Sequence, residues 1–441
     1  MRLLLSDVAA AVGGVHHGGP IAVDGATIDS RAVIGGELFV PIVAERDGHD
    51  FIAEAVERGV SAWLASRDVG VPGAWVEVDD TAAALLAVGR LARGHLPERV
   101  IAVTGSVGKT TVKDLAAAAV AGSFNTHAST RSFNNELGVP ITLAGAPAST
   151  EAVVVEMGAR ARGHIALLCG VARPTIGVVT VVALAHAETF ATIDEVARAK
   201  GELIETLPAT GTAVLNIDDA RVVGMRDRTE ARALLYGMAS GADVTAADVV
   251  IDDELRARFT LRSPWGDAPV HLEVRGAHQV TSALAAAAAA LAAGAELESV
   301  AAGLGEAAAA PHRMALQRAA SGALVLDDAY NANATSVAAA LHALVALPAR
   351  RHVAVLGVMA ELGDGGPAEH RRMRALAEAL GIELVAVDTD LYGVEPVTSI
   401  DAAVEALGAL GDGDAVLVKA SRIARLERVA EALIDSDGQS A

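Results

Sequence analysis

Residues 99–111 read Arg-Val-Ile-Ala-Val-Thr-Gly-Ser-Val-Gly-Lys-Thr-Thr, and an alanine-rich segment follows them. An apolar, β-branched run that leads into glycines and then into a helical pattern predicts a strand, a tight loop and a helix. In this layout backbone N–H groups and a helix N-terminus receive phosphate oxygens, a lysine reaches the outer phosphates and a hydroxyl reaches Mg²⁺. The stretch therefore predicts a phosphate-binding loop in which Lys109 and Thr110 supply those two side chains.

The match to the general phosphate-loop pattern is incomplete. That pattern has a glycine five residues before Gly108, and this chain has Val103 there. The alternative interpretation is an ordinary strand-to-helix turn with a solvated Lys109. The strand predicted before the loop and the helix predicted after it favour phosphate binding.

Composition restricts the class of partner. The chain has 441 residues, of which 52% are hydrophobic and 20% charged, so two to four domains with their own cores are expected. Acidic residues outnumber basic ones by 55 to 35, and the net charge of −20 argues against nucleic acid or an anionic membrane as partner. A phosphorylated ligand stays compatible with this charge, because lysines and helix termini act locally.

Cysteine usage and the N-terminus point to a reducing compartment. The single cysteine, Cys169, lies in an apolar context that is typical of a core residue, and one cysteine cannot form a disulfide within the chain. The N-terminus does not have the pattern of a signal peptide, and the alanine-rich runs are too short to span a bilayer. We therefore expect a cytoplasmic enzyme without membrane insertion.

The hydrophobic runs change character twice along the chain, which predicts an α/β fold of three domains. Residues 1–97 predict a small α/β domain that ends at a Gly-His-Leu-Pro segment. Residues 98–312 predict a central P-loop ATPase-like domain with a mainly parallel sheet, because near-continuous Val/Ile strands alternate with helical stretches. Residues 313–441 predict a Rossmann-like, doubly wound domain, in which ligands bind at the carboxyl ends of the strands.

Individual strands follow from the same runs. In the central domain we expect strands at residues 100–104, 152–158 and 174–182, and antiparallel hairpins within residues 243–274. The C-terminal domain is expected to have strands at residues 324–328, 352–357, 383–387 and 414–419.

Three side chains outside the loop are considered as candidates for the same site. Glu156 follows four apolar residues at the end of a predicted strand, where a carboxylate beside a phosphate loop holds Mg²⁺; the alternative is a strand end that faces solvent. His186 follows the strand at 174–182 and is expected at the same sheet edge, although its residue type alone decides nothing. Lys200 lies in a helical pattern at residues 192–207, and composition alone indicates a solvated lysine.

These motifs, taken together and in order, resemble the ATP-dependent Mur ligases of peptidoglycan synthesis over nearly the whole chain. They read Asp-Ser-Arg at 29–31, Gly-Glu-Leu-Phe at 36–39, Asp-Gly-His-Asp-Phe at 47–51, Thr-Gly-Ser-Val-Gly-Lys-Thr at 104–110, Phe-Asn-Asn-Glu-Leu-Gly-Val-Pro at 133–140, Glu-Met-Gly at 156–158, Ala-Lys-Gly-Glu at 199–202, Pro-His-Arg-Met at 311–314, Asp-Asp-Ala-Tyr-Asn-Ala-Asn at 327–333, Met-Ala-Glu-Leu-Gly at 359–363 and Val-Lys-Ala-Ser-Arg at 418–422. The strings at 327–333 and 359–363 resemble the dipeptide-adding members of the family.

The resemblance implies an ATP-dependent ligase that adds D-alanyl-D-alanine to a UDP-muramyl tripeptide through an acyl phosphate. It assigns residues 1–97 to the UDP-sugar, residues 98–312 to ATP, and residues 313–441 to closure on ATP and to the D-Ala-D-Ala acceptor. Its partners are these small molecules, and we expect a monomer. Three alternatives remain: a sister ligase for a single amino acid or polyglutamate, a P-loop switch or motor, and a binding module that has lost catalysis.

The resemblance also implies ATP and Mg²⁺ as cofactors, with two ions and a carbamylated Lys200. The residues it assigns to ATP are Gly105, Ser106, Val107, Gly108, Lys109, Thr110, Thr111, His278, Gln279, Arg313, Asp328 and Asn331. The metal ligands it implies are Thr110, Glu156, His186 and the Lys200 carbamate. The catalytic set is Lys109, Lys200, His186, Glu156 and Asn134. The substrate contacts it implies are Ser30, Arg31, His49, Asn134, Asn135 and Asn333.

Some of these residues have simpler interpretations. Asp328 and Asn331 could cap the following helix, and Arg313 could form an interdomain salt bridge. The family's adenine segment usually has an asparagine where this chain has Ser282, and Gln279 stands in place of another asparagine. These departures concern the adenine contacts and leave the phosphate and metal residues untouched.

Overall fold

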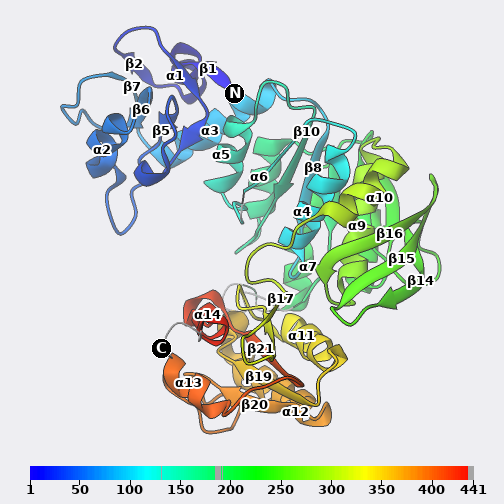
Figure 1. The fold of residues 1–441 in the computed structure, drawn as a ribbon. Coiled ribbons are helices and arrows are strands. Elements are labelled where there is room, and N and C mark those ends of the chain that lie inside the picture. Colours follow the sequence, from blue (N-terminus) through cyan, green and yellow to red (C-terminus); the bar gives the residue numbers. More distant parts are fainter. Residues whose placement is uncertain (131, 184–189, 191, 436–441) are drawn as a thin grey trace.

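The structure, a computed structural model, describes residues 1–130, 132–183, 190 and 192–435. It confirms the predicted α/β class, with several sheets and a mainly parallel central one. Three groups of elements follow one another along the chain (Figure 1) and are called the N-terminal, central and C-terminal units below.

The N-terminal unit contains a five-stranded sheet in the order β2-β7-β6-β5-β4 and a two-stranded pair, β1-β3. Its strands are β1 (Arg2–Leu4), β2 (Val15–His17), β3 (Ala22–Asp24), β4 (Ala26–Thr27), β5 (Leu38–Phe39), β6 (Ala62–Ala65) and β7 (Ala74–Glu77). Its helices are α1 (Leu5–Val12), η1 (Ser30–Ala32), η2 (Gly48–Phe51), α2 (Ile52–Glu57) and α3 (Thr81–Gly94).

The central unit is built on a six-stranded parallel sheet in the order β13-β12-β11-β8-β10-β9. Its strands are β8 (Val100–Thr104), β9 (Thr126–Ala128), β10 (Ala152–Glu156), β11 (Ile176–Val179), β12 (Thr212–Asn216) and β13 (Arg232–Tyr236). Its helices are α4 (Lys109–Ala121), α5 (Gly138–Gly145), α6 (His164–Ala172), α7 (Ile193–Glu205), α8 (Ala220–Val223), η3 (Gly224–Arg228), α9 (Gln279–Ala292) and α10 (Leu297–Glu306).

The strand β8 shows why the apolar run is continuous. Ile101 and Val103 belong to the core beneath α4 and α9, whereas Val100 and Ala102 belong to the core on the opposite face. Successive side chains of a strand point to opposite faces, so a sheet covered on both faces needs apolar residues at every position. The antiparallel strands expected within residues 243–274 are present as β14 (Thr245–Ile251), β15 (Arg256–Ser263) and β16 (Gly266–Arg275).

Two central strands are shorter than predicted. β11 ends at Val179 instead of continuing to residue 182. The Thr180 N–H still donates to the Thr104 carbonyl, but its hydroxyl bonds the phosphate loop and the Val181 carbonyl accepts from the Ser106 N–H. β10 ends at Glu156 instead of residue 158, because the N–H of Gly158 donates to the Asn134 carbonyl of another loop.

The C-terminal unit has a five-stranded sheet in the order β17-β18-β21-β19-β20, with β17 antiparallel at the edge. Its strands are β17 (Ala315–Arg318), β18 (Leu324–Asp327), β19 (Arg351–Leu356), β20 (Glu383–Ala386) and β21 (Asp414–Lys419). Its helices are α11 (Ala334–Ala346), η4 (Ala360–Gly365), α12 (Gly366–Ala379), α13 (Ile400–Ala406), η5 (Arg422–Ala424) and α14 (Glu427–Asp435). Separate hydrophobic clusters cover its two faces, as expected of a doubly wound sheet.

The N-terminal and central units share one hydrophobic core. Helix α3 packs against α5 and α6, and a Cβ at Gly89 would press on Pro140 and Val171. Glycine is therefore required at this crossing, because only a residue without a side chain allows the helices to approach so closely.

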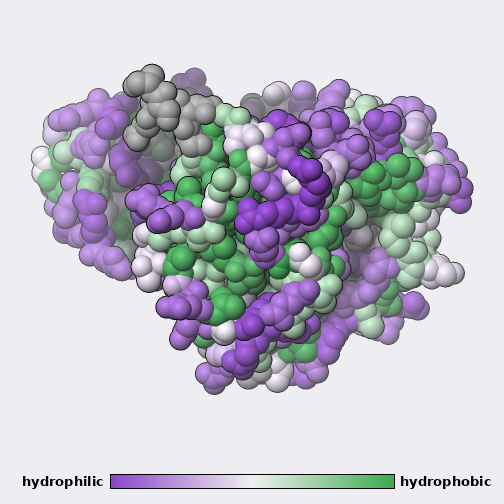
Figure 2. Space-filling view, turned by 60° about the horizontal axis from the view of Figure 1, so that its bottom comes forward, coloured by the Kyte–Doolittle hydropathy of each residue, from purple (hydrophilic) through white to green (hydrophobic). Residues whose placement is uncertain are grey.

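The outer surface is mixed in polarity. Figure 2 shows hydrophilic side chains around much of the rim of one face and hydrophobic ones nearer its middle. Among the described residues, no helix has both the length and the apolar character needed to cross a bilayer.

Candidate active site

The phosphate loop is fitted tightly against the segment that follows β11. Gly105 has a φ of +144°, and a Cβ at this position would overlap the Thr180 hydroxyl. That hydroxyl donates a hydrogen bond to the Val107 carbonyl at 2.6 Å, and the Ser106 hydroxyl donates to the Ala183 carbonyl at 2.7 Å. Gly105 is thus required both for its backbone conformation and for space.

Val103, which stands where the general phosphate-loop pattern has glycine, has a structural role in this chain. Val103 is fully buried inside β8 and pairs with Glu156 of β10 and Val178 of β11. The loop begins only after Thr104, so the position at which other phosphate loops have glycine belongs to a strand in this chain.

Lys109 is the first residue of α4 and folds back over the loop. Its Nζ donates to the Gly105 carbonyl at 2.9 Å and to the Ser106 carbonyl at 3.4 Å. Removal from water lowers the pKa of Lys109, while the charge of Glu156 acts in the opposite direction. The lysine therefore lies over the loop and donates to carbonyls that phosphate oxygens could replace.

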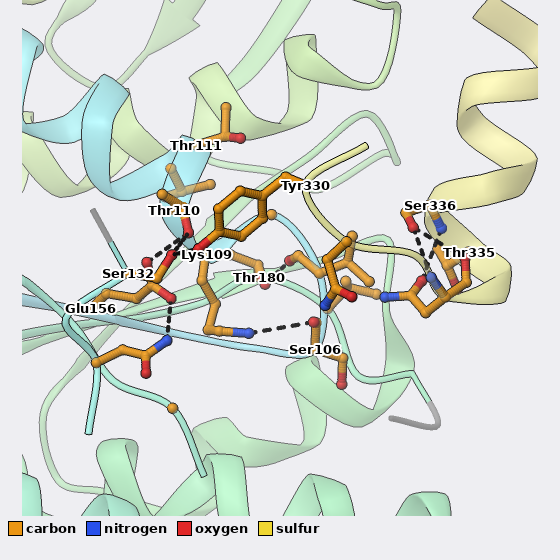
Figure 3. A pocket seen from close by; sticks show the side chains of 18 of the residues that line it. Ser106, Lys109, Thr110, Thr111, Ser132, Glu156, Thr180, Tyr330, Thr335 and Ser336 are labelled. Carbon is orange, nitrogen blue, oxygen red and sulfur yellow. Dashed lines mark hydrogen bonds between the residues drawn. The ribbon is translucent and has the colours of Figure 1, made fainter. Parts of the chain in front are cut away.

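Glu156 lies at the sheet edge predicted for it, in contact with two other candidate residues (Figure 3). It is 1% exposed, so the alternative of a strand end that faces solvent is wrong. One carboxylate oxygen accepts from the Thr110 hydroxyl at 2.7 Å, and the other accepts from the Asn134 amide at 2.7 Å. Thr110 and Glu156 thus present a hydroxyl and a carboxylate oxygen at one point, a donor set that suits Mg²⁺.

Lys200 is buried in α7, at 3% exposure, and lines the same cavity, so the interpretation as a solvated lysine is wrong. Burial, together with the smaller effect of the positive charge of Lys109, lowers the pKa of Lys200 to about 7. Its neighbours on the buried face of α7 are Val196, Leu203 and Ile204. Near neutral pH a large share of Lys200 is therefore the neutral amine.

The metal site is incomplete within the described residues. No group of three His, Cys, Asp or Glu side chains that could hold a metal occurs in the part of the chain that the structure describes. His186 lies outside the described residues. Thr110 and Glu156 are the expected ligands seen in place, and Lys200 as an amine is not the oxygen ligand that Mg²⁺ prefers.

Arg313 lies in the segment before β17, and its side chain enters the site. Its Nη2 donates to the Thr110 hydroxyl at 3.1 Å, and its guanidinium lies 4.0 Å from the Tyr330 ring centroid. Its Nε is buried and has no hydrogen-bond partner in the described structure. No ion pair joins Arg313 to a described carboxylate, so the interdomain salt bridge is not formed among these residues.

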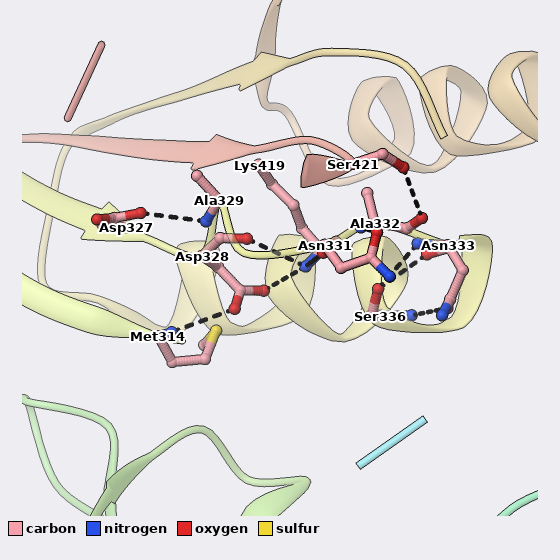
Figure 4. Close-up of polar contacts among 10 residues, drawn as sticks. All are labelled: Met314, Asp327, Asp328, Ala329, Asn331, Ala332, Asn333, Ser336, Lys419 and Ser421. Carbon is pink, nitrogen blue, oxygen red and sulfur yellow. Dashed lines mark hydrogen bonds and ion pairs between the residues drawn. The ribbon is translucent and has the colours of Figure 1, made fainter. Parts of the chain in front are cut away.

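The segment after β18 is held by a buried lysine (Figure 4). Lys419, 2% exposed, pairs with the Asp328 carboxylate at 2.5 Å and donates to the Asn331 carbonyl at 2.9 Å. The other Asp328 oxygen accepts from the Met314 N–H at 3.2 Å. Asn333, rather than Asp328 or Asn331, caps α11, with its side-chain oxygen on the Ser336 N–H at 2.9 Å.

These elements enclose a cavity of about 710 Å³ between the central and C-terminal units. The predicted residues that line it are Ser106, Val107, Gly108, Lys109, Thr110, Thr111, Asn134, Asn135, Glu156, Lys200, His278, Gln279, Arg313, Asp328, Asn331 and Asn333. Gly105 lies beneath the loop, against Thr180. The Gln279 side-chain oxygen, like the Arg313 Nε, is buried without a partner. Both residues line this cavity, which is large enough for a nucleotide, and buried polar groups normally have a partner.

Sequence reasoning left out several residues that line the cavity. Ser132, Thr180, Tyr330, Glu361 and Lys419 all contribute to its wall. The quoted motif strings contain Tyr330, Glu361 and Lys419, so the sequence offered a signal for these three. Thr180 comes directly after a strand, and nothing in the sequence marks Ser132.

The three residues predicted to contact a UDP-sugar do not line this cavity. The Ser30 hydroxyl donates to the Glu54 carboxylate at 3.0 Å. His49 is buried; its Nδ1 lies 2.6 Å from Asp47, and its Nε2 accepts from the Ser66 N–H at 3.0 Å. Arg31 is exposed and pairs with Asp29 at 2.9 Å.

Comparison with known proteins identifies the family. The Mur ligase middle domain model matches residues 103–290, and the model described as Mur ligase, glutamate ligase domain matches residues 312–422. The UDP-N-acetylmuramoyl-tripeptide–D-alanyl-D-alanine ligase of Mycobacterium tuberculosis is 40% identical over 470 aligned residues, which cover 93% of this chain and 92% of that protein. The chain belongs to the Mur ligase family.

Solved structures agree with this assignment. MurF from Acinetobacter baumannii matches this Mur ligase with a TM-score of 0.90 at 28% identity, over 99% of both chains. MurF from Thermotoga maritima, solved in complex with ADP, matches with a TM-score of 0.82 at 26% identity, over 94% of this chain and 97% of that one. The resemblance seen in the sequence is confirmed.

Proposed function

We propose that this Mur ligase is an ATP-dependent ligase that adds D-alanyl-D-alanine to a UDP-N-acetylmuramoyl tripeptide, the activity in the name of its M. tuberculosis relative. One observation carries the proposal: the buried Glu156 receives the Thr110 hydroxyl of the phosphate loop in a cavity that Lys109, Lys200 and Arg313 also line. Because both ATP and a UDP-linked peptide are consumed, we assign the reaction to the cytoplasm.

The chemistry explains why cations gather here. A carboxylate of the tripeptide attacks the γ-phosphorus of ATP, which gives an acyl phosphate and ADP; the dipeptide amine then attacks the acyl carbon, and phosphate leaves. Both partners of the first step are anionic, so Lys109, Arg313 and the loop N–H groups offset their repulsion. Thr110 and Glu156 would hold Mg²⁺, which would supply further positive charge to offset the repulsion.

Lys200 would become an anionic ligand by reaction with CO₂. The neutral amine attacks the carbon of CO₂, an N–C bond forms, and one proton is released to give a carbamate. The pKa of about 7 supports this step, because only the neutral amine is nucleophilic. A carbamate would supply the oxygen ligand that a second Mg²⁺ ion needs, together with the expected contribution of His186.

The nucleotide would extend from the phosphate loop toward α9. Gln279 and Arg313 each offer a buried polar atom without a partner, and we assign them to the adenine and to the phosphates. Asp328 and Asn331 would contact the nucleotide from the C-terminal unit. His278 lines the cavity at the start of α9 and would complete the adenine pocket.

The three units would divide the substrates among them. We assign residues 1–97 to the UDP-sugar, residues 98–312 to ATP, and residues 313–441 to the D-Ala-D-Ala acceptor. Arg31 is the substrate residue with an exposed charge, whereas Ser30 and His49 would act through the turns that they hold. Asn135 and Asn333 line the cavity, as the tripeptide carboxylate and the acceptor require.

The test is a ligation assay on the full chain. ADP release and product formation are measured with a UDP-muramyl tripeptide, ATP and Mg²⁺, and with D-Ala-D-Ala, single amino acids or no acceptor. We expect product only when D-Ala-D-Ala is the acceptor. Product only with single amino acids would indicate a sister ligase, and full ATP turnover without any acceptor would indicate a P-loop switch or motor.

A further inference from the structure

A hydrogen bond joins the C-terminal and central units at the edge of the cavity. The Tyr330 hydroxyl lies 2.7 Å from the Ser132 hydroxyl, although 198 residues separate them in the chain. Ser132 follows β9 in the central unit, and its oxygen lies 3.4 Å from the Thr110 hydroxyl. Tyr330 therefore reaches the candidate metal ligand through one intervening side chain (Figure 3).

The ring of Tyr330 has a second contact. The Arg313 guanidinium lies over it at 4.0 Å, and the same guanidinium donates to Thr110. A cation over an aromatic face is attracted to it, and the attraction grows as water is excluded. The ring thus fixes the orientation of an arginine that has a buried Nε without a partner.

The backbone links the arginine and the tyrosine into one assembly. His312 and Met314, on either side of Arg313, have φ values of +59° and +53°, a conformation that side chains disfavour. The Tyr330 N–H donates to the His312 carbonyl at 3.0 Å, and the His312 ring bonds Asp327 at 2.7 Å. The strained turn that presents Arg313 is therefore held by the segment that carries Tyr330.

We infer that Tyr330 is a positioning residue for ATP: its ring holds Arg313 against Thr110, and its hydroxyl fastens this pair to Ser132 of the central unit. The inference rests on the proposed function, since it takes the Thr110 side of the cavity as the place of the outer phosphates. Tyr330 acts through Arg313 and Ser132 and takes no part in bond making.

The expected effect follows from the loss of one hydrogen bond between units. Removing it lowers the equilibrium constant for the joined arrangement by about three- to tenfold, and the apparent affinity for ATP falls by up to the same factor. Tyr330→Phe and Ser132→Ala should each raise the KM for ATP by this amount while kcat at saturating ATP stays within about twofold. The double variant should be no worse than Ser132→Ala alone, because that change already removes the hydrogen bond to Tyr330.

A larger change separates the ring from the hydroxyl. Tyr330→Leu removes both contacts and should raise the KM for ATP by about tenfold beyond Tyr330→Phe, because Arg313 is released as well. The matched control is Tyr392→Phe, which removes a buried hydroxyl in the same unit that donates to the Gly357 carbonyl, away from the cavity. This control should leave the KM for ATP unchanged.

The experiment measures KM and kcat for ATP on the full-length variants, together with calorimetric titration by ATP and Mg²⁺. Any of three results would overturn the inference: an unchanged ATP affinity in Tyr330→Phe, a KM increase in the double variant equal to the product of the two single increases, or equal KM values for Tyr330→Phe and Tyr330→Leu. The titration requires no product, so a wild-type chain that binds ATP but does not ligate would count against the proposed function and not against the role of Tyr330.

Discussion

The cavity and the N-terminal unit both carry family motifs, yet their side chains are used differently. Around the cavity, the Gln279 oxygen and the Arg313 Nε are buried without partners. In the N-terminal unit, both nitrogens of His49 and the hydroxyl of Ser30 are already occupied by neighbours in the chain. We therefore expect the motif residues around the cavity to serve a ligand and those of the N-terminal unit to serve the fold, because their hydrogen-bond partners differ in this way.

The largest effect is expected at Lys200. Lys200→Ala should lower ligation by about 10³-fold or more, because the second anionic ligand is lost at the point where charge develops. ATP binding, measured by titration, should persist. Arg198→Ala, at an exposed position on the same helix, is the control and should keep nearly full activity. Near-normal turnover in Lys200→Ala would refute the carbamate role.

Arg313 should show the next largest effect. Arg313→Ala removes charge-assisted contacts worth about 1.5–3 kcal/mol each, so the KM for ATP should rise by about 10- to 100-fold. Arg318→Ala, on the nearby β17 and paired at the surface with Asp412, is the matched control. Equal KM values for the two variants would show that the partnerless Nε does not mark a ligand site.

The pH should change the neutral fraction of Lys200 by a smaller factor. The folded pKa of Lys200 is about 7, below its ordinary value of 10.5, so the amine is mostly protonated at pH 6 and mostly neutral at pH 8. The neutral fraction rises about tenfold across this interval. The ¹³C NMR signal of the carbamate, in ¹³C-bicarbonate at a fixed CO₂ concentration, should rise with it. A signal that persists in Lys200→Ala would belong to another amine.

The smallest effect on ligand binding is expected for His49→Ala. This change should instead lower the stability of the fold. His49→Ala leaves the Ser66 N–H and the Asp47 carboxylate without their buried partner, so the free energy of unfolding should fall by about 1–3 kcal/mol. Denaturant melts measure this change, with His17→Ala, at a partly exposed position, as the control. If His49→Ala left the denaturation midpoint unchanged and raised the KM for the UDP-linked substrate, the comparison would be reversed, since His49 would then serve the ligand.

Much of the fold could be predicted because its strands carry strong local signals. The Val/Ile runs identified β8, β10 and β11 of the central sheet and β18–β21 of the C-terminal sheet, and short alternating runs indicated the hairpins of β14–β16. The strands β9, β12, β13 and β17 were not predicted. The ends of β10 and β11 could not be predicted, because they depend on contacts with loops distant in the chain. The Thr180 hydroxyl beside Gly105 is one such contact, and it exists only because β8 and β11 are neighbours.

The site was predicted unevenly for the same reason. The burial of Lys200 had a signal in the sequence: with Val196, Leu203 and Ile204 it follows the spacing of one apolar helix face. The pair of Ser132 and Tyr330 had none, because no local pattern relates residues 198 positions apart. Local patterns thus identify the side chains, and only the packed units show which of them meet.

The core shared through α3 has a consequence for how the molecule comes apart. Cooperative unfolding follows packed cores rather than stretches of sequence, and α3 packs on α5 and α6 within a single cluster. The N-terminal and central units should therefore melt together, in one transition. The C-terminal unit, whose two clusters take only Leu255 from the central unit, should open or melt separately.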